Sequence, residues 1–390
     1  MFAKTVKLLP VARNVQYSAV EKCRRGCTSS LFITGDRATE SFSALKPHVD
    51  LDNRFKDIET LCKNVALRGL KIDVKQLKSS WDHLQGVRKY KASLEKERLM
   101  NSAKFKAAQT SRLMEEFTAE SSQLKEKLRS ATKEMWEWEK KAVIGGLSLP
   151  NDLNSETPVL EDEKIVHEYG QRPDSRDASP SHLEVSRKLG LVEYYDASYY
   201  FLKDEAAQFE MGISYLFMDK LKADGFIPMS NSDFGKSITV EGVGLNPRDA
   251  TSVFTLEKDA NMIDPIARLH LVGGASLVSF CAYHARSVAQ FKRLPLRYVA
   301  MGRHYNPDSN NSLQGLFSTW QSSAVETFVA TADSDTAMTE FRRELKTAID
   351  LYESLGYHFR VQYLPPKNLK QWESLRASFQ MFSRNLNCNS

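Results

Sequence analysis

The residue types that carry most enzyme chemistry are present, but their spacing matches no established site. Three histidines, His270, His284 and His304, are too scattered to predict a metal site. The run GGAS at residues 273–276 is rich in glycine, yet it has neither the spacing nor the following lysine of a phosphate-binding loop. No serine sits in a nucleophile elbow. We therefore expect neither a metal ion nor a cofactor.

A further candidate is the stretch LPLRYVAMGRHYNPDSNNSLQGLFSTWQ, residues 294–321. One strand-like run ends in a polar loop, and a second strand-like run returns from it. A loop of this kind needs cationic side chains to hold a nucleotide. Asn306 and Asp308 stand at its start and supply an amide and an acid instead.

Length and composition limit what can position these residues. With 390 residues, 42% of them hydrophobic, the chain can form two or three domains with sizeable cores. No run of 18 apolar residues is present to predict a membrane-spanning helix. The cysteines are odd in number and scattered, which argues against a disulfide framework: Cys23, Cys27, Cys62, Cys281 and Cys388.

The first 35 residues are basic and poor in acids, with apolar residues that can share one helical face. This composition is typical of a mitochondrial transit peptide, so we predict that residues 1–35 address the chain to the mitochondrial matrix. A disordered basic tail is the alternative.

Charge is distributed unevenly along the chain. Residues 50–144 hold 21 Lys+Arg and 15 Asp+Glu, a net charge of +6, and residues 1–49 hold 8 and 3, a net of +5. Subtraction from the totals of 54 and 49 leaves 25 and 31 for residues 145–390, a net of −6. A polyanion is therefore expected to bind the front part.

Residues 50–146 predict a basic helical hairpin. No proline occurs between Pro47 and Pro150, and no glycine between Gly86 and Gly145. Apolar residues at steps of three, four or seven predict a coiled-coil seam: Leu113, Phe117, Leu124, Leu128, Ala131, Met135, Trp138 and Ala142. A shorter run predicts the antiparallel partner: Leu77, Trp81, Leu84, Val87, Tyr90 and Leu94. We expect the turn near residues 99–109 and a rod on the order of 50 Å long.

Cations concentrate near the expected turn: Lys89, Lys91, Lys96, Arg98, Lys104, Lys106 and Arg112. They are candidates for binding RNA, because cations that neutralise phosphates release counterions. A solvated helix face is the alternative interpretation.

Beyond Gly145 the chain changes character. Residues 147–180 are interpreted as a linker, and residues 181–390 alternate helical and strand-like runs. One helical run, QFEMGISYLFMDKLKADG, is expected to end at Gly225 as its C-cap, and the strand-like runs are RLHLVGGASLVSF, LRYVAMGRHY, GLFSTWQ, VETFVATA and YHFRVQYLP. The fold expected is α+β: the helical arm, then a mostly antiparallel sheet domain with flanking helices.

The order of hairpin, LPN linker, HLEVSRKLGL, LPLRYV and GLFSTWQ resembles seryl-tRNA synthetases, class II enzymes with a coiled-coil arm. The resemblance runs from about residue 50 to the C-terminus. It implies an arm that grips tRNA, a sheet domain that activates serine with ATP, and pairing of two subunits through the first class II motif.

The positions that the family uses for substrates differ in this chain. The Thr-x-Glu pair that holds the substrate amine corresponds to Gly274 and Ser276. The Arg-x-Glu pair that orients ATP corresponds to Asn306 and Asp308. Downstream, the family's arginine, histidine and glutamate correspond to Ser318, Trp320 and Ser323. Residues that maintain the strands are kept: Gly315, Leu316, Phe317, Gln321 and Glu326.

Two other motifs also depart from the family pattern. The third class II motif has no match up to Ser390, so we expect a domain that lacks it; only Ser383 and Arg384 resemble a nearby serine-side segment. In the first motif Asn231 lies near an expected proline, which leaves the pairing surface altered.

We interpret the chain as a degenerate, non-charging mitochondrial paralogue. It would form a heterodimer with the active mitochondrial seryl-tRNA synthetase, contact RNA, expected to be tRNA-Ser, and support mitochondrial translation. Two alternatives stay open. One is a divergent active serine-tRNA ligase in which Arg297 or Arg303 replaces the lost arginines; the other is a coiled-coil scaffold that binds no RNA.

Overall fold

The computed structural model describes residues 29, 31, 49–107, 110–159, 163–172, 180–256, 268–307, 315–383 and 388–389. Almost all of the predicted transit peptide, Asp308 and Arg384 lie outside these residues. The chain divides into two compact units: an arm unit with the helical hairpin and residues 366–374, and a sheet unit with the strands. Within the described part no helix is long and apolar enough to span a bilayer.

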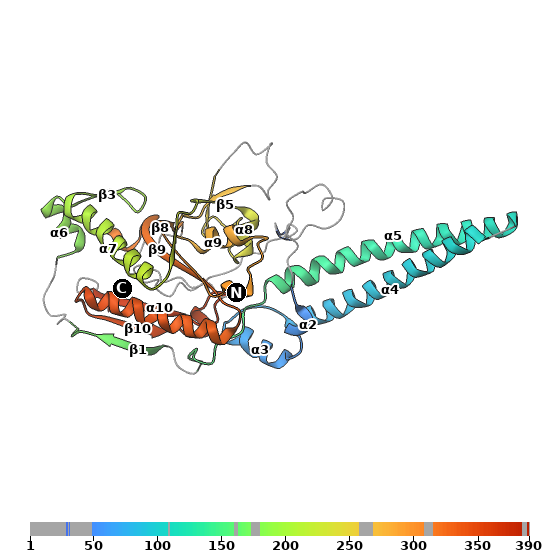
Figure 1. Ribbon diagram of the computed structural model, residues 1–390, viewed down its shortest axis with the longest axis horizontal. Coiled ribbons are helices and arrows are strands. Elements are labelled where there is room, and N and C mark those ends of the chain that lie inside the picture. Colours follow the sequence, from blue (N-terminus) through green and yellow to red (C-terminus); the bar gives the residue numbers. More distant parts are fainter. Residues whose placement is uncertain are drawn as a thin grey trace. The chain divides into compact units, whose positions relative to one another are not determined.

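The hairpin of the arm unit consists of α4 (Val74–Ala107) and α5 (Ser111–Leu147), which lie side by side in Figure 1. Their seam is buried at Leu84 and Leu94 of α4 and at Leu124, Leu128 and Ala131 of α5. The predicted turn at residues 99–109 is too wide, because α4 continues to Ala107. The helix-forming sequence NSAKFKA contains no residue that would stop it earlier.

The seam does not extend over every predicted position. Tyr90 and Leu113 are largely exposed, although their spacing predicted burial. Near the tip, the seam ends in Asn101, whose buried side-chain amide donates to the carbonyl of Phe117 at 3.3 Å.

The base of the arm is a small helical core. The helices α2 (Leu51–Arg54) and α3 (Ile58–Leu67) start at Asp50 and Asp57, whose carboxylates accept hydrogen bonds from the backbone amides of Asn53 and Thr60. Leu51, Leu61 and Val65 pack against Leu77, Trp81, Leu84 and Ala142. A Cβ atom at position 145 would lie 2.5 Å from Leu77 Cδ1, so a larger residue there would require the Leu77 side chain to shift.

The sheet unit is built around two long strands, β8 (Leu296–Tyr305) and β9 (Gln321–Ala330). They pair antiparallel over their whole length, from Leu296 opposite Ala330 to Tyr305 opposite Gln321. The short β4 (Ile227–Met229) adds to β8 in parallel. A second sheet has the order β1 (Lys164–Tyr169), β10 (Phe359–Tyr363), β11 (Ala377–Ser383) and β12 (Cys388–Asn389), all antiparallel. The expected α+β fold with a mostly antiparallel sheet is therefore confirmed.

Two helices supply the main core of the sheet unit. Phe217 and Leu221 of α7 (Asp204–Ala223) and Leu351 and Tyr352 of α10 (Ser334–Ser354) share one cluster with strand residues. These strand residues are Val299, Val325, Val329, Phe359 and Val361. Since Phe280 packs with Phe328 and Ala300 in another cluster, α9 (Leu277–His284) covers the opposite face of β8 and β9.

Smaller elements complete the sheet unit. Three of them are helical: α6 (His182–Leu189), α8 (Ser237–Gly242) and the 3-10 turn η2 (Phe291–Arg293). Two short sheets consist of β2 (Val192–Tyr194) with β3 (Tyr200–Leu202), and of β5 (Phe234–Lys236), β7 (Leu269–Leu271) and β6 (Phe254–Thr255). After α7, Gly225 adopts φ +88°, in agreement with its predicted role at the helix end.

Two runs predicted as strands are mainly something else. In RLHLVGGASLVSF only Leu269–Leu271 is a strand, and the apolar run that follows forms α9. In GLFSTWQ the residues Gly315–Phe317 form a 3-10 turn, η3, and β9 begins only at Gln321. Short apolar runs suit a buried helix as well as a strand, so periodicity could not separate the two.

Candidate functional site

The end of β8 and the start of β9 bring several altered positions together. Asn306 follows β8 directly, and its backbone N–H donates to the carbonyl of Trp320 at 2.8 Å, which extends the ladder by one step. Ser323 lies opposite Arg303 in the ladder. Ser318 is buried just after the turn Gly315–Phe317. Asn306 and Ser323 therefore both take part in a regular antiparallel pairing of strands.

The GGAS turn lies directly against β8. The backbone N–H of Ala275 donates to the carbonyl of Arg303 at 3.3 Å. Gly273 has φ +87°, and a Cβ atom on it would lie 2.1 Å from that same carbonyl oxygen. Only glycine allows this approach, so the turn is tightly packed against the strand backbone.

Gly274 and Ser276 have no charge to offer a substrate amine. The N–H of Gly274 donates to Asp233 Oδ1 at 2.6 Å, and its carbonyl accepts from Asn231 Nδ2 at 3.1 Å. Asn231, which departs from the family's first motif, therefore helps to hold the turn. Ser276 precedes α9, is buried, and its hydroxyl has no hydrogen-bond partner.

Arg297, one of the two proposed replacement arginines, is bound to a carboxylate of the protein. Its Nε and Nη2 donate to the two oxygens of Glu340 at 2.6 and 2.7 Å. This bidentate hydrogen bond raises the pKa of Arg297 and lowers the pKa of Glu340. Both side chains are largely buried, so the guanidinium is committed to β8–α10 packing.

Arg303 is held more loosely. Its Nη1 donates to Ser323 Oγ at 2.9 Å and lies 3.3 Å from Glu210 Oε1 of α7. Nearly half of the Arg303 side chain is exposed. Arg303 thus contacts one altered position, Ser323, and a carboxylate of the protein already faces it.

Two of the three histidines singled out in the sequence, His270 and His284, pack within the sheet unit. His270 is fully buried between the hydroxyls of Ser237, 2.8 Å from Nε2, and Thr255, 3.1 Å from Nδ1. Burial lowers the pKa of His270. His284 stacks on Phe328 with ring centroids 5.3 Å apart. No group of three potential metal ligands occurs among the described residues.

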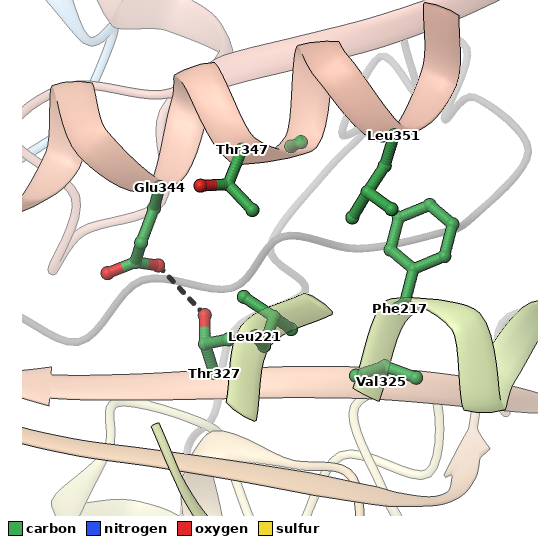
Figure 2. A pocket seen from close by; sticks show the side chains of 8 residues that line it. Phe217, Leu221, Val325, Thr327, Glu344, Thr347 and Leu351 are labelled. Carbon is green, nitrogen blue, oxygen red and sulfur yellow. Dashed lines mark hydrogen bonds between the residues drawn. The ribbon is translucent and has the colours of Figure 1, made fainter. Parts of the chain in front are cut away.

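A small cavity lies between α7, β9 and α10 (Figure 2). Its volume of about 10 Å³ has room for roughly one water molecule. Phe217, Leu221 and Leu351 line it, and at one end Thr327 Oγ1 donates to Glu344 Oε2 at 2.9 Å. It is far too small for a nucleotide.

The arm presents its cations differently. Within the described residues, five of the seven RNA-binding candidates make no ion pair: Lys89, Lys96, Arg98, Lys104 and Lys106. The other two have loose, helix-internal partners, Lys91 with Glu95 at 3.8 Å and Arg112 with Glu116 at 3.5 Å. Steps of seven and eight residues place Lys89, Lys96 and Lys104 along one side of α4, while Lys91 and Arg98 lie on another. One phosphate strand can therefore meet about three of them.

Sequence reasoning missed the exposed apolar surface on the outer side of α7. Four large apolar residues there are about half exposed or more: Phe209 61%, Met211 55%, Tyr215 56% and Leu216 48%. Ile227 of β4, an element in contact with α7, is 57% exposed. The signal was present in the sequence, because FEMGISYLFM has apolar residues on every side of a helix and not only on one.

Known proteins are similar to this chain in sequence and in fold. The chain is 28% identical to the serine-tRNA synthetase-like protein Slimp of Drosophila melanogaster over 95% of its length and 79% of that protein. It is 24% identical to the mitochondrial serine-tRNA ligase of Bos taurus, over 86% of this chain and 68% of the relative. The seryl-tRNA synthetase of Pyrococcus horikoshii, solved with ATP, superposes with a TM-score of 0.76 at 17% identity, over 88% of this chain and 82% of that one.

The resemblance is confirmed. This chain is seryl-tRNA synthetase-like in both sequence and fold. The sequence similarity includes a synthetase-like insect protein as well as serine-tRNA ligases, so it supports the family resemblance without deciding between a ligase and a non-charging paralogue. No family model matches the chain.

Proposed function

We propose that this protein is a catalytically inactive paralogue of mitochondrial seryl-tRNA synthetase. It pairs with the active enzyme in the mitochondrial matrix, contacts tRNA-Ser through its arm, and supports tRNA charging and mitochondrial translation. The main support is that the ATP-orienting arginine position is Asn306, while the two remaining arginines of β8 face Glu340 and Glu210.

The loss of activity follows from electrostatics. Activation of serine transfers the adenylyl group of ATP to the serine carboxylate and releases pyrophosphate. This step depends on preorganised cations and donors, and removal of one such donor costs roughly 100-fold to 1,000-fold in rate. Here Ser276, Asn306, Ser318 and Ser323 lack the charge that the family pattern requires, and Gly274 lacks the hydroxyl of the family's threonine. The rate losses at these positions do not have to be additive for turnover to be abolished.

The support for pairing is the apolar outer face of α7. A helix that is hydrophobic on all sides is normally buried on all sides, but the described part of the chain covers α7 on only one side. A second subunit that covers Tyr215 and Leu216 would remove this exposed surface from water. The basic N-terminal residues and the mitochondrial ligases among the relatives support the mitochondrial location.

Catalytic inactivity is tested by serine-dependent exchange between ATP and pyrophosphate. We expect no exchange above a protein-free control, with the active mitochondrial enzyme as the positive control. A robust, serine-dependent rate from this chain alone would establish the alternative of a divergent ligase.

Pairing is tested by copurification of the tagged full-length chain with the active mitochondrial enzyme. We expect a heterodimer that the double variant Tyr215→Glu/Leu216→Glu disrupts, because two charges would be buried without partners. The matched control is Tyr195→Glu, at an exposed tyrosine next to β2 rather than on α7. A strict homodimer or a monomer, formed even with the active enzyme present, would rule out this part of the proposal.

RNA contact is tested by the salt dependence of binding to a tRNA-Ser transcript. About three phosphate contacts predict that log K falls with log salt concentration with a slope of about −3. Affinity that hardly changes with salt, or no binding at all, would favour a coiled-coil scaffold without RNA.

A further inference from the structure

The connection between β10 and β11 is built into the arm unit. Both strands belong to the sheet unit, and the hairpin is closed there by the N–H of Leu364, which donates to the carbonyl of Arg376 at 3.0 Å. The loop itself, residues 366–374, packs with the arm unit, where Leu369 is buried. It begins with the 3-10 turn η4 (Pro366–Asn368), which contacts α3.

Arg68, just after α3, holds this loop. Its side chain makes four hydrogen bonds although the residue is only 6% exposed. Nη1 donates to the carbonyl of Lys370 at 2.8 Å, and Nη2 donates to the carbonyls of Glu373 at 2.7 Å and Asn151 at 2.9 Å. Nε donates to Asn64 Oδ1 at 2.8 Å. One guanidinium therefore joins α3, the segment after α5 and the β10–β11 loop.

The acceptors explain why an arginine is needed. Three of them are carbonyls in irregular backbone, and backbone carbonyls in folded proteins are normally hydrogen-bonded. Two also accept from other donors, Asn151 from Asn64 Nδ2 and Lys370 from the N–H of Glu373, so the particular contribution of Arg68 is to join all three. Among the described residues, no carboxylate lies within ion-pair distance of Arg68, so its role is to donate hydrogen bonds in several directions. A lysine has no fork that could reach the same set of acceptors.

Asn151 reinforces the same junction. Its N–H donates to the carbonyl of Gln371 and its Nδ2 to the carbonyl of Trp372, both at 2.8 Å. Farther along, the N–H of Asn154 donates to the carbonyl of Ser374 at 3.0 Å. The segment after α5 and the β10–β11 loop are thus joined by several hydrogen bonds to backbone carbonyls, and the buried Arg68 side chain bonds to both segments.

We propose that Arg68 is a positioning residue that locks the β10–β11 loop to the base of the arm and so couples RNA binding on the arm to strands β10 and β11. An arm that is ordered by a ligand then restrains the loop, and the loop restrains the strands that it connects. The coupling rests on the proposed RNA contact, whereas the lock itself does not.

The lock is tested by hydrogen exchange on the full-length protein. Arg68→Lys keeps the charge but loses the fork, so we expect the amides of residues 366–374 to exchange about tenfold faster or more. The matched control is Arg54→Lys. Arg54 bonds Asp152 and the carbonyl of Pro150 in the same unit but does not touch the loop. Unchanged exchange at residues 366–374 in Arg68→Lys would overturn the lock.

The coupling is tested by adding a tRNA-Ser transcript to the same proteins. We expect binding to slow exchange in β10 and β11 of the wild type and of Arg54→Lys. Arg68→Lys should bind the transcript with the same Kd but lose this protection, which a merely structural role would not predict. Protection that persists in Arg68→Lys would overturn the coupling. A wild type that does not bind the transcript would refute the RNA contact, and the exchange rates of the free proteins would still decide the lock.

Discussion

The arm and the sheet unit use their cations in opposite ways. On α4, Lys89, Lys96, Arg98, Lys104 and Lys106 are exposed and make no ion pair with any carboxylate that the structure describes. On β8, Arg297 and Arg303 each face a glutamate that a helix of the same unit supplies. A cation that is paired within the protein must give up its carboxylate partner before it can bind a phosphate. An unpaired cation has no such partner to lose. The contrast supports the proposal that the arm binds RNA, and it gives the β8 arginines a part in packing within the sheet unit.

The largest effect on stability is expected at Arg297, the β8 arginine that is paired most closely with a carboxylate. Arg297→Ala should lower the free energy of unfolding by about 3 kcal/mol, because Glu340 would stay buried without its partner. Denaturant unfolding measures this loss, and RNA affinity should not change. The double variant with Glu340→Gln should recover part of the stability. A neutral Arg297→Ala would show that this arginine is not committed to the fold.

The next effect concerns the arm. Replacement of Lys89, Lys96 and Lys104 by glutamine should weaken binding of a tRNA-Ser transcript roughly tenfold or more and reduce the steepness of the salt dependence by about 3. Stability should change by less than about 0.5 kcal/mol, because these side chains are exposed and unpaired. The control triple, Lys91, Arg98 and Lys106 to glutamine, lies on other sides of α4. Equal losses from the two triples would contradict contact with a single phosphate strand.

A smaller effect is expected at Arg303. Glu210→Gln removes the carboxylate that lies 3.3 Å from the guanidinium, and this partly exposed pair should be worth under about 1 kcal/mol. The variant should still show no exchange between ATP and pyrophosphate, because the other altered positions remain. If exchange appeared, Arg303 would be a working replacement for the lost arginine, and the contrast between arm and sheet would fail.

The smallest effect is a pH dependence at His182. The N–H of Leu316 donates to His182 Nε2 at 3.0 Å, so this nitrogen must be unprotonated in the folded chain. Burial lowers the pKa of His182 below its ordinary 6.5. The unfolded chain therefore takes up the proton first, and this contribution to stability is present above pH 6.5 and is lost as the pH falls through the folded pKa. Stability of His182→Gln measured between pH 7.5 and about 5 should fall less steeply than that of the wild type.

Sequence reasoning succeeded where a pattern is local. The run LRYVAMGRHY became β8 with the same bounds, and the heptad-like positions Leu124, Leu128 and Ala131 became the buried seam. It failed at Tyr90 and Leu113, where periodicity gives the side of a helix but not whether the partner covers it. It also failed at Gly315–Phe317, a turn held partly by the contact of Leu316 with His182, 134 residues away in the chain.

The loss of charge at Ser276, Asn306, Ser318 and Ser323, and of a hydroxyl at Gly274, is a property of the sequence, because folding cannot restore a missing side-chain group. The excess of cations in the arm and the absence of helix breakers between residues 86 and 145 are determined in the same way. The sequence could not show that Arg297 meets Glu340, that α7 exposes its outer side, or that Arg68 reaches Lys370, since these partners are remote in the chain. Only the tertiary structure brings such residues together, and their distances decide which cations remain free to bind a ligand.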